Sequence, residues 1–159
     1  MHKFVSIAVL PLAAACQQQT AEQARIEPVT QAQADKIVAA TGKSYVASDA
    51  SAIMAHYADG AVMFDQGLLA PIADRQLQTK LTQGFAATQP RDFTVANRAI
   101  QILDADTFVA SGVTSFTIQL GQARQPTRAR FTQVYKRQGD GSWKIVHEHM
   151  SAPPAGSPL

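Results

Sequence analysis

The sequence predicts a single α+β domain in which three helices pack on a strongly curved antiparallel sheet. In the first half of the chain, apolar residues recur every three or four positions, as they do along one face of a helix. From Phe93 onward they alternate instead, in long stretches separated by turn residues, as they do in half-buried strands. Helices followed by a run of antiparallel strands are typical of α+β domains with the helices on one face of the sheet.

Two helices are expected ahead of the first strand. The first carries an apolar stripe made of Ile37, Val38, Thr41, Tyr45 and Val46. The second follows over residues 50–57 with Asp49 as its N-cap, and the Asp59-Gly60 pair supplies the turn that ends it. A short strand is then expected over residues 61–64.

A third helix and four strands complete the expected domain. Pro71 suits a first helical turn, and the helix should stop near Gly84. The strands are expected over residues 93–103, 107–120, 128–137 and 142–150, with a loose turn at 121–126 and a tight hairpin at 138–141. One face of the second of these strands should meet the helices, through Phe108, Ala110, Gly112, Thr114, Phe116, Ile118 and Leu120.

Both ends of the chain are expected to lie outside the domain, which should cover residues 31–151. Residues 1–15 combine a short basic start with an apolar run too short to span a bilayer, which is typical of a cleaved signal peptide. Residues 16–30 are expected to hold a lipidated cysteine and a flexible, Gln- and Ala-rich linker. The Pro-rich residues 152–159 are expected to form a disordered tail.

Cys16 is the only cysteine, so no intrachain disulfide is available to the protein. The stretch from Leu10 to Cys16 resembles the lipobox of bacterial lipoproteins, in which the cysteine is diacylated and becomes the new amino terminus. With Gln17 after the cysteine, this resemblance implies an exported lipoprotein on the periplasmic side of the outer membrane. The alternative is cleavage after one of the alanines, which would give a soluble periplasmic protein.

The charge balance does not favour nucleic acid as a partner. The formal net charge is +2 at pH 7, and it falls further once the segment carrying Lys3 is removed. Arg124, Arg128 and Arg130 lie close together in the sequence, but they alternate with turn and strand residues and are interpreted as a solvated hairpin.

Two stretches of the chain carry a family pattern. His56 to Gly67 resembles the helix-end and first-strand signature of the nuclear transport factor 2-like superfamily. Trp143 to Ser151 resembles the closing strand of its SnoaL-like members and of the association domain of calcium/calmodulin-dependent kinase. The resemblance covers about residues 31–151 and implies a cone-shaped, cystatin-like roll around an apolar pocket. Because this fold carries isomerases, cyclases, hydrolases and assembly modules, it does not imply one activity.

Ketosteroid isomerase is the member of this superfamily whose chemistry can be compared residue by residue. Its general base is an Asp eight positions after an aromatic residue, and Tyr57 and Asp65 have that spacing, so the resemblance implies Asp65 as the catalytic acid/base. Counting back from the last hairpin places Gln133 where the isomerase has a hydrogen-bond donor. The alternatives are an Asp65 bonded to the Gln66-Gly67 turn and a Gln133 that satisfies backbone groups.

The isomerase's tyrosine donor has no direct counterpart, because the matching position holds Thr41 and the nearest phenol is Tyr45, one helical turn away. Altogether the expected ligand contacts are Thr41, Tyr45, Tyr57, Phe64, Phe116 and Tyr135.

The last strand offers two further groups of polar residues. His147 and His149 stand two apart, so they should face the same way, on the face of Trp143 and Ile145. No third metal ligand is evident, so no metal site is expected. Glu148 alternates to the other face and becomes a second carboxylate candidate if that face lines the pocket.

Two classes of function remain open from the sequence. In the first, a small apolar molecule binds in the cone and is isomerised or otherwise processed without a cofactor. In the second, the domain serves assembly and pairs with a second copy of itself as a homodimer through the broad sheet face.

Overall fold

The computed structural model describes residues 27–156, and it confirms the predicted α+β class. The expected signal peptide, Cys16 and most of the 16–30 linker lie outside the described residues. The elements in chain order are α1 (Gln31–Tyr45), α2 (Ala50–Met54), β1 (Tyr57–Phe64), α3 (Arg75–Ala87), β2 (Arg91–Ile102), β3 (Thr107–Leu120), β4 (Ala123–Arg137) and β5 (Trp143–Ser151). No helix within this described part is long and apolar enough to cross a bilayer.

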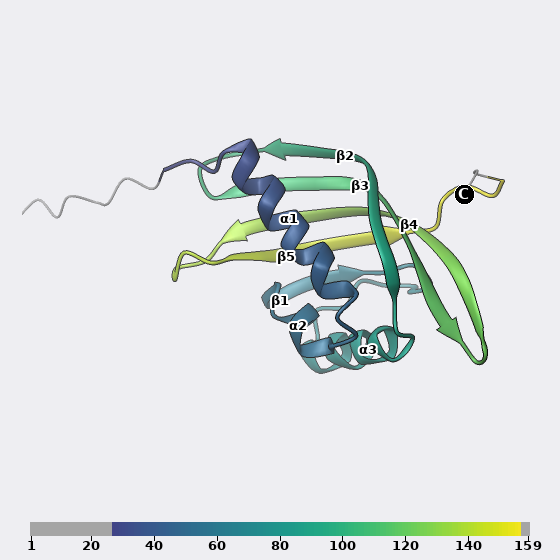
Figure 1. The fold of residues 1–159 in the computed structure, drawn as a ribbon. Coiled ribbons are helices and arrows are strands. Elements are labelled where there is room, and N and C mark those ends of the chain that lie inside the picture. The colour runs from purple at the N-terminus through teal and green to yellow at the C-terminus, as the bar shows by residue number, and fades with distance from the viewer. Residues whose placement is uncertain (1–26, 157–159) are drawn as a thin grey trace, which may run out of the picture.

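Five strands form one sheet in the order β1-β5-β4-β3-β2. All neighbours pair antiparallel except β1 and β5, which run parallel, so the expectation of a wholly antiparallel sheet needs this correction. Helix α1 crosses one face of the sheet, and α2 and α3 lie together beyond the β1 edge (Figure 1). β2 bends toward α3 (Figure 1).

Local signals explain where the helices begin. Thr30 accepts a hydrogen bond from the Gln33 backbone N–H at 3.2 Å, and its own N–H donates to the Gln33 side chain at 2.9 Å, which forms a capping box at α1. Asp49 caps α2 as predicted, and Asp74 caps α3 by accepting from the Leu77 N–H at 2.7 Å.

The predicted ends of α2 and α3 are wrong by several residues. α2 stops at Met54 rather than at residue 57, because the chain turns there and Tyr57 already pairs with Ile145 as the start of β1. α3 begins at Arg75 rather than at Pro71, because Ile72 is held in extended conformation by a bridge to Met63. α3 then continues past Gly84 to Ala87.

The hairpin between β3 and β4 is tighter than predicted. Leu120 and Ala123 are paired, so the turn consists of Gly121 and Gln122, and Gly121 has a φ of 59°, which glycine adopts readily. β4 therefore begins at Ala123, five residues before the predicted start, and Arg124, Arg128 and Arg130 lie on the strand itself.

A register shift in β5 overturns the prediction that Trp143, Ile145, His147 and His149 share one face. Tyr135 pairs with Ile145, but the preceding residue Val134 pairs with His147, so β5 carries one extra residue at Val146. Ile145 and Glu148 are consequently both buried, whereas His147 and His149 are exposed on the opposite face.

The sheet curves sharply along the β2–β3 pair. β2 shifts register between Ala96 and Ala99, and Asn97 there has a φ of 51°. Opposite this bulge, a Cβ on Gly112 would lie 3.0 Å from the Phe131 ring and 3.1 Å from the Ala96 carbonyl oxygen. Glycine is therefore required for the close approach that lets the sheet bend.

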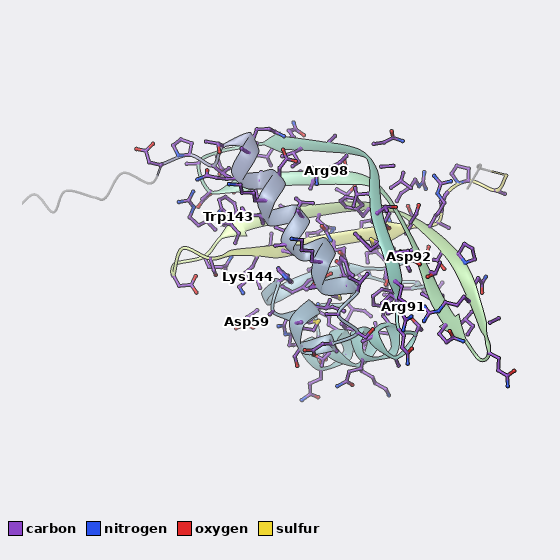
Figure 2. All side chains as sticks on the ribbon, viewed as in Figure 1. Asp59, Arg91, Asp92, Arg98, Trp143 and Lys144 are labelled. Atoms are coloured by element: carbon purple, nitrogen blue, oxygen red, sulfur yellow. The ribbon has the colours of Figure 1, made fainter. Side chains whose placement is uncertain are left out.

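The core extends along the sheet from Phe108 and Ile145 to Met63 and Phe131. Phe108 and Tyr135 stack with ring centroids 4.7 Å apart, and Ile145 is fully buried beside them. Trp143 covers this end of the core, with the Arg137 guanidinium 5.0 Å from its ring. Arg98, labelled in Figure 2, ties β2 to α1 through an ion pair of 2.6 Å with Asp35. The other end of the cone stays open.

Candidate functional site

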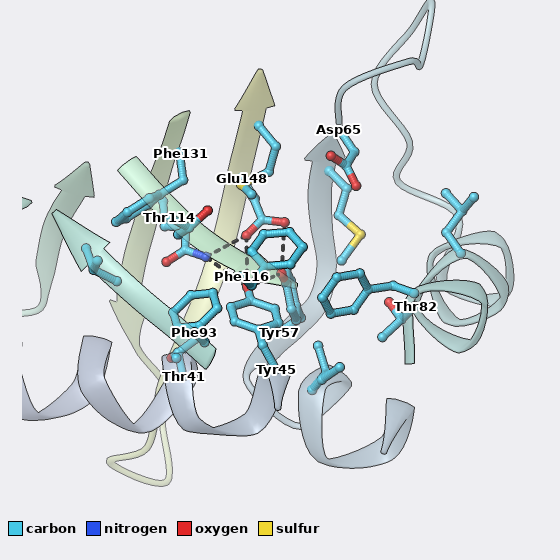
Figure 3. Close-up of a pocket in the computed structure, with 18 of the residues that line it drawn as sticks. Thr41, Tyr45, Tyr57, Asp65, Thr82, Phe93, Thr114, Phe116, Phe131 and Glu148 are labelled. Carbon is cyan, nitrogen blue, oxygen red and sulfur yellow. Dashed lines mark hydrogen bonds between the residues drawn. The ribbon is translucent and has the colours of Figure 1, made fainter. Parts of the chain in front are cut away.

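A pocket of about 110 Å³ lies in the open end of the cone, between α1, α3 and the inner face of the sheet. A single water molecule needs about 10–15 Å³ of such cavity volume. The pocket therefore has room for a molecule of one or two rings. Its walls are mostly apolar and come from every helix and strand of the described domain and from the loop after β1, and Figure 3 draws 18 of the lining residues. Six aromatic residues belong to the wall: Tyr45, Tyr57, Phe85, Phe93, Phe116 and Phe131.

Four polar side chains meet on the sheet side of this pocket. Glu148 of β5 accepts from the Tyr57 hydroxyl at 2.9 Å through Oε1, and from the Tyr45 hydroxyl at 3.2 Å through Oε2. The Gln133 Nε2 atom donates to Glu148 Oε2 at 2.5 Å and to the Tyr45 oxygen at 3.1 Å. The two phenol oxygens lie 3.1 Å apart. Dashed lines in Figure 3 mark these contacts, and we call these four residues the polar cluster.

A fifth residue orients the polar cluster from behind. The Tyr135 hydroxyl donates to Gln133 Oε1 at 2.7 Å. Because that amide oxygen accepts from Tyr135, the Gln133 NH₂ group is turned toward Glu148 and Tyr45. Glu148 itself reaches the cluster because β4 and β5 pair Gln133 with Glu148 directly, beyond the Val146 bulge.

Burial controls the protonation of the polar cluster. It raises the pKa of the Glu148 carboxyl group above its ordinary value of 4.5, although the hydrogen bonds from Gln133, Tyr57 and Tyr45 oppose this by stabilising the anion. The negative charge of Asp65 adds to the rise. Burial likewise raises the pKa of Tyr45 and Tyr57 well above 10.0, with the Glu148 charge as the second cause, so both phenols stay protonated at neutral pH.

Asp65 lies at the end of β1 on the rim of the same pocket (Figure 3). Its Oδ1 atom accepts from the Gln66 backbone N–H at 2.7 Å, which is the turn contact that the sequence left open as an alternative. The residue is exposed to solvent on its outer side. The protein atoms on its inner side desolvate the carboxyl group and raise its pKa above 3.8, and the Gln66 hydrogen bond partly offsets this rise.

Six of the eight residues expected to contact a ligand line the pocket: Thr41, Tyr45, Tyr57, Asp65, Phe116 and Gln133. Phe64 lies outside the lining because its neighbour Met63 faces inward, and the Phe64 ring stacks on His149 at 5.3 Å on the opposite face. Tyr135 is fully buried behind the pocket and acts on it only through Gln133.

Sequence reasoning missed the pocket residues that α3 and β2 contribute. Leu81 and Phe85 stand four residues apart, as on one face of a helix, and Phe93 and Val95 begin the alternation of β2, but neither pattern indicates an open cavity. The signal available was the presence of Phe85, Phe93 and Phe116 on elements expected to face one another.

The histidines do not converge with the acids. Within residues 27–156, no group of three or more His, Cys, Asp and Glu side chains could hold a metal ion. His56 lies behind the pocket, with its Nδ1 atom 3.4 Å from the Thr41 hydroxyl. Burial lowers the pKa of His56 below 6.5, and the charge of Lys144 lowers it further.

Comparison with known proteins agrees with this architecture. Residues 34–155 match the family of SnoaL-like domains. No curated protein matches the chain at a significant level. A solved structure from Xanthomonas campestris, described as a proposed calcium/calmodulin-dependent protein kinase II association domain, superposes with a TM-score of 0.71 at 23% identity, over 80% of this chain and 91% of that one.

Two further solved structures show the same fold. A ketosteroid isomerase-like protein from Erwinia carotovora atroseptica has a TM-score of 0.65 at 16% identity, over 78% of this chain and 94% of that one. A nuclear transport factor 2-like protein with a cystatin-like fold from Novosphingobium aromaticivorans has a TM-score of 0.59 at 15% identity, over 77% and 80% of the two chains. At such identities the likeness establishes the fold alone, and it confirms the predicted cystatin-like roll.

Proposed function

We propose, from the premise that the chain belongs to the family of SnoaL-like domains, that its cone binds a small, largely apolar molecule. One observation carries the proposal: mostly apolar walls enclose a cavity of about 110 Å³ on which the polar cluster converges. Binding sites for small molecules combine these features, because apolar walls supply affinity and a few polar groups fix the orientation.

Asp65 is the group best placed to move a proton to or from such a molecule. It stands on the rim, and its raised pKa brings the carboxylate closer to the range in which a general base works at neutral pH. An isomerase of ketones also needs a hydrogen-bond donor for the enolate oxygen. Both N–H bonds of Gln133 are engaged inside the polar cluster, so the geometry supports binding more strongly than isomerisation.

Binding is tested with 2-naphthylmethanol, a neutral two-ring probe, by following the melting temperature as the probe concentration rises. A compound that binds only the folded state raises the melting temperature by mass action. Leu68→Trp should block the mouth, because Leu68 lines the pocket from the loop after β1. Leu69→Trp is the matched control, since Leu69 is fully exposed and does not line the pocket.

We expect a concentration-dependent rise in wild type and in Leu69→Trp, and none in Leu68→Trp. A rise of equal size in Leu68→Trp, or no rise in wild type, contradicts binding in the cone.

An assembly function is the second candidate, and two observations favour it. The Phe64–His149 stack and His147 stand on the face of the sheet opposite the pocket, where a second copy could pack as a homodimer. The Xanthomonas campestris structure is described as an association domain. Two measurements distinguish this candidate from the first. An assembly domain should sediment as a dimer, and 2-naphthylmethanol should not raise its melting temperature.

A further inference from the structure

The threonines that line the pocket have no hydrogen atom to offer a ligand. Thr41 donates to the Ile37 carbonyl oxygen at 3.2 Å, one helical turn back. Thr82 donates to the Gln78 carbonyl oxygen at 2.9 Å, and Thr114 donates to the Ala129 carbonyl oxygen at 3.2 Å across the β3–β4 pair. The hydrogen atoms of these three hydroxyls are therefore used in bonds to backbone carbonyl oxygens.

The polar cluster has no spare donor either. Five contacts join its members, two from Gln133, two from the phenols to Glu148 and one between the phenols. The two phenols bring one hydrogen each and the Gln133 amide brings two, while a protonated Glu148 would add one more. Whether Glu148 is ionised or protonated, the five contacts take up every hydrogen in the cluster.

Hydrogen-bond acceptors, in contrast, are left over. A carboxylate offers about four acceptor sites. Glu148 receives three hydrogen bonds from Tyr45, Tyr57 and Gln133 within the described part of the chain, and Asp65 receives one from the Gln66 backbone. Both carboxylates line the pocket, so a bound molecule meets acceptors there.

The charges and rings of the lining favour the same kind of ligand. Of the residues between 27 and 156 that line the pocket, two are acids and none is Lys, Arg or His. Tyr45, Phe85, Phe116 and Phe93 form a closed circuit of ring contacts, with successive centroids 6.0, 5.7, 6.1 and 5.4 Å apart. Aromatic rings attract a cation through their negative faces, and more strongly in a site shielded from water.

We infer that the pocket takes an amine on a flat apolar body, with the ammonium group donating to Glu148, and that it rejects carbonyl compounds and acids. This inference rests on the proposed binding function and names its ligand class. An ammonium group supplies the donors and the positive charge that the site lacks. A ketone brings only a further acceptor, and a carboxylate brings a negative charge to a pocket whose described lining holds the two acids Glu148 and Asp65 and no Lys, Arg or His.

The test uses four probes that share one naphthalene body: 2-naphthylmethylamine, 2-naphthylmethanol, 2-acetonaphthone and 2-naphthoate. Their dissociation constants are measured by calorimetry at pH 7. We expect the amine to bind at least about tenfold more tightly than the ketone, the alcohol to fall between them, and the naphthoate to bind most weakly. Because all four probes share the naphthalene ring system, its apolar contribution to binding is the same for each. Differences in their dissociation constants therefore reflect the polar substituent.

Two variants locate the effect. Glu148→Gln keeps the shape of the side chain and removes its charge, and it should bring the amine-to-ketone ratio close to one. Asp65→Asn should lower the ratio less than Glu148→Gln does, because Asp65 stands on the solvent-exposed rim. Loss of the ratio in Asp65→Asn but not in Glu148→Gln overturns the assignment to Glu148.

The possible outcomes distinguish failure of this inference from failure of the proposed binding function. If the ketone or the naphthoate binds as tightly as the amine, the inference fails and binding in the cone stands. If none of the four probes binds, the proposed function fails and the inference fails with it.

Discussion

Glu148 illustrates how much a single buried residue determines in this protein. It joins two phenols and an amide on the inner face of the sheet, and it is one of only two charged residues among the described residues of the lining. Its carboxyl group has lost most of its water, so the charged form is disfavoured unless a ligand or a hydrogen bond compensates. Protein stability should therefore register the titration of Glu148.

The pKa of Glu148 is raised above 4.5 in the folded protein, so between 4.5 and the raised value the folded state holds a proton that the unfolded state has released. Its contribution to stability is consequently full below about pH 4.5 and is lost as the pH rises through the folded pKa. Each unit by which the pKa is raised corresponds to roughly 1.4 kcal/mol.

The prediction is tested by urea unfolding of wild type and Glu148→Gln between pH 4 and pH 8. The free energy of unfolding of wild type should fall relative to that of the variant as the pH rises. Asp65, with a raised pKa, and His56, with a lowered one, are present in both proteins, so the difference reports Glu148 together with its interaction with Asp65. Parallel pH profiles would show that Glu148 titrates as in the unfolded chain.

At the scale of elements, the sequence predicted what depends on neighbouring residues and missed what depends on pairing. Asp49 was identified as an N-cap because its role depends only on the residues that follow it. The extra residue at Val146 could not be read from alternation, because β5 pairs with β4 on one side and with β1 on the other. The start of α3 failed for a similar reason, since the bridge between Ile72 and Met63 overrides the preference of Pro71 for a first helical turn.

The residues of the candidate site also fall into two groups, those that sequence spacing predicted and those that depended on strand pairing and packing. Asp65, Gln133 and Tyr57 were found from spacing that resembles a family pattern, and all three line the pocket. The inward direction of Glu148 stayed open until the register of β5 was known, and the contribution of Phe93 required the packing of β2 against α1. At Gly42 of α1, for example, a Cβ would lie 3.0 Å from the Phe93 ring, a fit between residues far apart in the sequence.

The bend between β2 and β3 makes a testable prediction about glycine. Gly112→Ala should destabilise the protein by about 1–3 kcal/mol, because the new methyl group meets the Ala96 carbonyl oxygen and the Arg98 Cα as well as a ring. Gly84→Ala should instead stabilise it by roughly 0.5–1 kcal/mol, since Gly84 lies within α3 with open space around it.

Urea unfolding of the two variants and of Gly139→Ala, where a Cβ would also meet nothing within 4 Å, measures these effects. A Gly112→Ala protein as stable as wild type would show that β2 can move away from β3 at little energetic cost. The curvature would then not depend on the missing side chain.

At the scale of the whole molecule, the described fold reaches back to the region just after the expected anchor. Val29 is buried, and its N–H donates to the Ala105 carbonyl oxygen at 3.3 Å, while the Arg137 side chain donates to the Glu27 carbonyl oxygen at 3.0 Å. The chain between Cys16 and Val29 can span at most about 45 Å when fully extended. A lipid on Cys16 would therefore keep the cone within that distance of a membrane surface.

We propose that Cys16 carries this lipid, and the sequence makes the test unambiguous because the protein has no second cysteine. Bacteria producing the protein are grown with an alkyne-bearing palmitate, and the protein is purified and coupled to a fluorescent azide. We expect wild type to be labelled and to sediment with the membrane fraction, and Cys16→Ser to be unlabelled. Because Cys16 precedes residues 29–151 in the sequence, we expect the purified Cys16→Ser protein to keep the melting temperature of the folded domain, which serves as the control for folding. Mature wild-type protein without label, recovered from the soluble periplasmic fraction, would show that the segment before Cys16 is removed as an ordinary signal peptide.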